Sequence, residues 1–91
     1  MKIIKLEDSH SWDEEKNCMR VDVNIDGADI ICYFTREAIE DFASANGLDP
    51  DPMIAFDGRR KYLLTFLLNH LEIMDTDNVT EVVITTEILN A

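Results

Sequence analysis

Apolar and polar residues alternate on both sides of an Asp-Gly pair in the stretch CMRVDVNIDGADIICYFT. This pattern is typical of a β-hairpin with a two-residue turn at Asp26 and Gly27. One face of the hairpin then carries the cross-strand pairs Ile25 with Ala28, Val23 with Ile30, Val21 with Cys32 and Met19 with Phe34. We expect that face to be buried. The other face should meet mostly solvent, and it carries Cys18, Arg20, Asp22, Asn24, Asp29, Ile31, Tyr33 and Thr35.

After the hairpin, the spacing of apolar residues changes from that of a strand to that of a helix. Thr35 is a typical helix N-cap, and Gly47 is a typical stop, so a first helix is predicted between them. The stretch LDPDPMIAF places Asp51 as a second cap, with Pro52 at the first helical position. The second helical segment is expected to run from there toward Leu71, and Gly58 is where it can bend or break.

The two ends of the chain complete the sheet. KIIKL predicts a short first strand, and the β-branched stretch VTEVVITTEIL predicts a final strand. The order β-β-β-α-α-β over 91 residues predicts a single α+β domain, residues 1–91. We expect an antiparallel sheet with both helices packed on one face.

Charge narrows the range of partners. The chain has 19 acidic and 8 basic residues, a formal net charge of −11, which disfavours direct binding to phosphate backbones. No signal peptide or membrane-length apolar run is visible, so we expect a cytoplasmic protein that does not bind membranes. Two cysteines in a chain of this size indicate free thiols in a reducing compartment.

Several short motifs suggest chemistry that their context does not support. DVNIDG matches the start of a calcium-binding EF-hand loop, but Tyr33 stands where the closing Glu is required and the flanks are predicted strands. DPDP and DTDN are typical of turns and helix caps. His10 and His70 have no second ligand at a zinc spacing. We therefore predict no catalytic residues, no metal and no cofactor.

Arg59, Arg60 and Lys61 form the one run of three cations in the chain. Helical spacing through this segment places Arg60 near the middle of a leucine face, with Arg59 and Lys61 on its flanks. A cation on an apolar face needs an anionic partner. Arg60 is therefore expected to pair with a carboxylate of this chain, and the alternative is an anion-binding site centred on Arg60. Arg59 and Lys61 are expected to be exposed, pointing in different directions.

Tyr62 and Phe66 lie four residues apart on the side of the same helix that faces away from the leucines. A helix with two apolar faces indicates a contact beyond its own sheet. That contact is either the first helix or a partner, including a second subunit of a homodimer.

The run VDVNIDGADIICYFTREAIEDFA, followed by AFDGRRKY, resembles the small bacterial domain-of-unknown-function family 1488. Its features are the Asp26-Gly27 turn, Cys32, the helix opening TREAI from Thr35 to Ile39, and Phe56 followed by an arginine. The resemblance implies a compact α+β domain in a bacterial cytoplasm, and it transfers no activity.

These observations favour a non-catalytic protein-interaction or regulatory module over an enzyme. Two alternatives remain. The protein could be a small anionic-ligand-binding module centred on Arg60, or an acidic decoy that occupies a nucleic-acid-binding protein.

Overall fold

Three strands are followed by three helices along the chain, and this order confirms the α+β class. The structure is a computed structural model that describes residues 2–90 and leaves the side chains of residues 7–9 aside. Its elements are β1 (Ile4–Asp13), β2 (Cys18–Ile25), β3 (Ala28–Thr35), α1 (Arg36–Ala45), α2 (Pro52–Gly58), α3 (Arg60–Ile73), β4 (Glu81–Ile84) and α4 (Thr86–Leu89). Within the described residues the strands form one sheet in the order β1-β2-β3-β4.

The hairpin of β2 and β3 has the predicted register, from Ile25 opposite Ala28 to Cys18 opposite Thr35. Asp26 and Gly27 both have positive φ angles, 52° and 91°, as a type I′ turn requires. The amide of Gly27 donates to Asn24 Oδ1 at 3.0 Å. Two oxygens of the calcium-like motif are therefore engaged within the chain, since Asp26 Oδ1 also accepts from Ile3 N at 2.9 Å.

Exposure on the second face of the hairpin differs from the prediction at two positions. Cys18 and Tyr33 are both buried, although alternation placed them on the solvent side. The thiol of Cys18 donates to the Lys16 carbonyl at 3.1 Å, and Lys16 Nζ lies 5.2 Å from the centre of the Tyr33 ring. The turn before β2 therefore covers this end of the face, which alternation within one strand cannot reveal.

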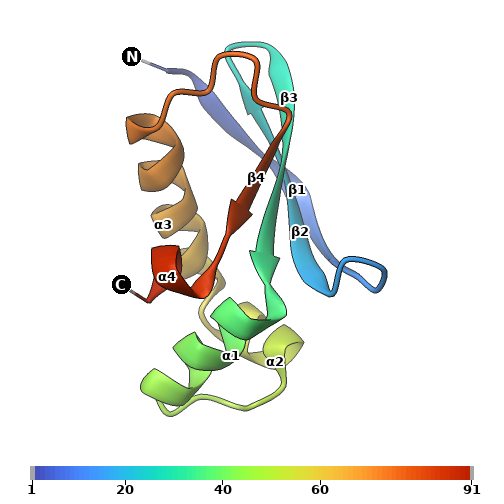
Figure 1. Ribbon diagram of the computed structural model, residues 1–91, viewed down its shortest axis with the longest axis vertical. Coiled ribbons are helices and arrows are strands. Elements are labelled where there is room, and N and C mark those ends of the chain that lie inside the picture. The colour runs from blue at the N-terminus through green and yellow to red at the C-terminus, as the bar shows by residue number, and fades with distance from the viewer. Residues whose placement is uncertain (1, 91) are drawn as a thin grey trace.

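β4 runs parallel to β3, with Cys32 opposite Val82 and Phe34 opposite Ile84. The predicted wholly antiparallel sheet is therefore wrong for this strand, because α3 carries the chain back along the sheet before β4 begins (Figure 1). The predicted final strand is also shorter than expected. Thr86–Leu89 turns into α4, with Leu89 buried and the Thr86 hydroxyl donating to Asp41 of α1 at 2.5 Å.

The helices begin where their caps predict, but there are more of them. Thr35 Oγ1 accepts from Ala38 N at 3.1 Å, and the Asp51 side chain accepts from Met53 N at 2.9 Å. The expected second helix is two helices. Arg59 between them has φ −127° and ψ 26°, outside the helical region, so α2 ends at Gly58 and α3 begins at Arg60.

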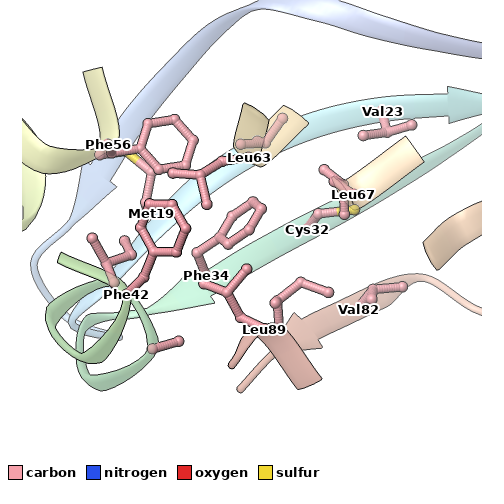
Figure 2. Packing of buried hydrophobic residues seen from close by; sticks show 14 of the residues in the cluster. Met19, Val23, Cys32, Phe34, Phe42, Phe56, Leu63, Leu67, Val82 and Leu89 are labelled. Atoms are coloured by element: carbon pink, nitrogen blue, oxygen red, sulfur yellow. The ribbon is translucent and has the colours of Figure 1, made fainter. Parts of the chain in front are cut away.

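One apolar core lies between the helices and one face of the sheet. Figure 1 shows α3 beside the sheet and α1 with α2 at the end of β3. Figure 2 shows Phe34 and Cys32 of β3 among side chains from α2 and α3, including Phe56, Leu63 and Leu67. In the part of the chain that the structure describes, no helix has the length and apolar character needed to cross a membrane.

Candidate binding site at the junction of α2 and α3

The break between α2 and α3 creates an open hollow on the surface. Its volume is about 570 Å³. It is lined by Asp57, Gly58, Arg59, Arg60, Lys61, Tyr62 and Thr65, and these residues are called the basic hollow below. Three positive and one negative side chain give its lining a net charge of +2, on a protein whose total is −11.

The three cations meet here because the chain is not one continuous helix. Arg59 is the non-helical residue at the break, and Arg60 and Lys61 open α3. Continuous helical spacing would have separated them by about 100° each. All three nevertheless line the same hollow, because the break that follows Gly58 brings Arg59 beside the start of α3. The expectation that their side chains point in different directions stays a prediction.

Arg60 is not buried, although the helical spacing of α3 aligns it with the leucine face. It is exposed, as are Arg59 and Lys61, whereas Leu63, Leu67 and Leu71 are fully buried. Arg60 is the first residue of α3, which places it at the end of the helix, before the first buried leucine, Leu63. Arg60 therefore begins its helix at the surface. Its pairing with a carboxylate of this chain stays a prediction.

Tyr62 gives the hollow a fixed aromatic wall. Its ring stacks on Phe42 of α1, with centroids 5.5 Å apart and planes at 21°. The residue nevertheless remains 57% exposed, so the stacked ring still presents apolar area to solvent. Ile54 of α2, one helical turn before Gly58, is also exposed. Tyr62 therefore makes the contact with the first helix that the sequence left as one of two alternatives.

Phe66 has a different position. It is half-buried against the core, and its ring stacks on His70 with centroids 6.3 Å apart. It does not line the basic hollow. The two aromatic residues that the sequence grouped together therefore have different ring partners, Phe42 of α1 for Tyr62 and His70 of α3 for Phe66.

The acidic residue in the hollow is held by the first strand. Asp57 Oδ1 lies 2.7 Å from Nε2 of His10, and the His10 ring packs on Phe56 at 5.2 Å. His10 therefore ties β1 to α2 at the edge of the hollow.

The cysteines lack the environment of reactive thiols. Burial raises the pKa of Cys32 to about 12, with a further contribution from Asp22. Burial also raises the pKa of Cys18, Asp13 adds to the shift, and Lys16 opposes it. Both remain free. Among the described residues, no group of three His, Cys, Asp or Glu side chains is arranged to hold a metal ion.

The molecule is thus a small α+β protein with helices along one face of a mixed sheet and a cationic hollow at a helix junction. It belongs to the family described as protein of unknown function (DUF1488), whose model matches residues 4–84. A crystal structure of a protein of unknown function from this family, from Shewanella loihica PV-4, has the same fold. The TM-score is 0.59 at 18% identity, over 87% of this chain and 90% of that one. No curated protein matches the chain.

Proposed function

We propose that the protein is a non-catalytic protein-interaction module that binds an acidic segment of a partner in the basic hollow. The observation that carries this proposal is the convergence of Arg59, Arg60 and Lys61 on one open hollow beside the exposed ring of Tyr62. Charge complementarity of this kind steers association and selects partners. Arg and Tyr are the residue types enriched where binding energy concentrates.

The shape of the hollow favours a chain segment over a small molecule. Sites for small ligands usually enclose most of the ligand surface, whereas this hollow lies open on the protein surface. The occupant we propose has carboxylates for the cations and an apolar side chain for Tyr62. The raised pKa values of both thiols support a role without nucleophilic chemistry.

A titration with synthetic peptides tests this function. One peptide carries several Glu residues around a central Leu, and the control peptide has Lys in place of each Glu. We expect the acidic peptide to bind, with an affinity that falls as salt is added. The double variant Arg60→Ala with Lys61→Ala should bind it at least about tenfold more weakly, a loss of about 1.4 kcal/mol.

Arg36→Ala combined with Lys16→Ala is the matched control. It removes the same charge from exposed cations that do not line the hollow, and it should leave binding nearly unchanged. Equal losses in the two double variants would mean that only total charge matters, which contradicts the proposed site. If inorganic phosphate binds and the peptide does not, the anionic-ligand module centred on Arg60 replaces this proposal.

A further inference from the structure

The outer edge of β4 is the second feature that points to a partner. β4 ends the sheet opposite β1 and pairs with β3 on its inner side. The fading colours place β1 and β2 farther from the viewer than β4 (Figure 1). An edge strand presents unpaired amide and carbonyl groups, which are a template for another strand.

β4 is short, with four residues, but it has no Lys, Pro or bulge to keep another strand away. Seven of the eight residues in VTEVVITT, residues 79–86, are β-branched, and Glu81 is its one charged residue. Proteins usually guard such strands with Lys, Pro or a bulge. The opposite edge is guarded in this way, because β1 carries several charges and has a register shift between Leu6 and His10.

The direction of each backbone group on β4 follows from its register with β3. Ile31 N donates to the Thr80 carbonyl at 3.0 Å, and Ile31 lies opposite Glu81. In a parallel pair, alternate residues turn their amide and carbonyl groups to the partner strand. Val82 therefore faces β3, whereas Glu81 and Val83 direct these groups outward. The side chain of Val83 is 44% exposed beside them.

We infer that β4 pairs antiparallel with β4 of a second copy of this chain, with the two Val83 residues opposite each other. In this register the outward groups of Val83 in each copy exchange both hydrogen bonds. The side chains of the two Val83 residues meet on the open face, and Val82 meets Ile84 of the partner copy on the core face. The result is one continuous sheet with both helix layers on the same side.

A second copy fits this edge because the register is self-complementary. A two-fold axis through Val83 places Glu81 opposite Thr85 of the other copy, so the two Glu81 residues lie about four residues apart along the strands. That separation is about 13 Å, which exceeds the screening length of roughly 8 Å at physiological salt. The one charge in this stretch therefore does not oppose pairing.

Sedimentation equilibrium of the full chain over a concentration series tests the inference. The wild type should approach twice its mass of 10.4 kDa. Val83→Lys places like charges directly opposite at the centre of the interface, so it should weaken association at least tenfold. Ile73→Lys is the matched control, since Ile73 is an 85% exposed aliphatic residue on α3, and this variant should associate like the wild type.

Hydrogen exchange of the Val83 amide provides a readout that does not depend on a variant. Pairing predicts protection that rises with protein concentration, and this result would support the proposal even if Val83→Lys failed to fold. A wild type that stays monomeric, with a Val83 amide that exchanges rapidly at every concentration, overturns it. Protection only after a foreign extended peptide is added also overturns it, because the edge would then receive a partner's strand.

Discussion

The alternation of single residues in the hairpin decides which substitutions the protein tolerates. Val23 is 1% exposed on the core face, whereas its neighbour Asn24 is partly exposed on the other face. Val23→Asp should lower the free energy of unfolding by at least about 3 kcal/mol, because it buries a charge among apolar side chains. Chemical denaturation measures this loss.

Asn24→Asp is the control for that substitution, with an effect of its own. Asn24 Nδ2 donates to Asp29 Oδ1 at 3.0 Å across the hairpin. The substitution removes this donor and puts two carboxylates opposite each other, which should lower stability by about 1 kcal/mol or less. Equal losses at positions 23 and 24 would contradict the assignment of the two faces.

The raised pKa of the Cys32 thiol predicts how the stability of the protein changes at high pH. Its folded pKa is raised to about 12 from an ordinary value of 9.0, so the unfolded thiol loses its proton first. This stabilising contribution is fully present below pH 9 and is lost as the pH rises toward about 12. The stability difference between the wild type and Cys32→Ala should therefore shrink over that interval, by at most about 1.4 kcal/mol per pH unit. A stability difference between the two proteins that stays constant from pH 8 to 11 would contradict the raised pKa of Cys32.

At the scale of elements, the glycines at helix ends provide a matched pair of substitutions. Gly47 has a φ of 65°, whereas Gly58 has no positive φ, and an added methyl group would meet no atom within 4 Å at either position. Gly58→Ala should raise the free energy of unfolding by about 0.4 to 1 kcal/mol. Gly47→Ala should lower it by a similar amount or more, because alanine is strained there. Thermal unfolding of both variants compares the two directions, and stabilisation by Gly47→Ala would be inconsistent with the left-handed cap.

Elements differ in how far local sequence determines them. The hairpin was predictable with its register because Asp26 and Gly27 specify the turn and the flanking residues alternate. The stretch after Ile84 was not, because its β-branched residues favour a strand, while burial of Leu89 and the bond from Thr86 to Asp41 produce α4. The direction of β4 likewise depends on the path of α3, which no local pattern encodes.

The candidate site was predictable in its residues but not in its geometry. Arg60 and Tyr62 stood out from the sequence, and both line the basic hollow. Their convergence with Arg59 and Lys61 depends on the backbone angles of Arg59. The stacking of Tyr62 on Phe42 depends on where α1 packs. Such contacts join distant segments, so helical periodicity alone cannot locate them.

At the scale of the whole molecule, the net charge of −11 makes the two proposed interactions respond differently to added salt. Binding of an acidic segment in the basic hollow is an attraction between opposite charges, so added salt should weaken it. Pairing of two β4 edges brings two acidic molecules together, so added salt should strengthen it by screening their repulsion. The same salt series, followed by peptide titration and by sedimentation, thus moves the two affinities in opposite directions.

The position of β4 also bears on the order of events during synthesis. β1, β2 and β3 are neighbours in sequence and need only short connections to pair, whereas β4 must wait for α1, α2 and α3 to be made. Closing so long a loop is slow compared with forming a hairpin. Until β4 docks, the edge of β3 is the one that nascent chains expose, and it bears Asp29 at its start. We therefore expect the edge suited to a second copy to form late in folding, so that unfinished chains do not associate through it.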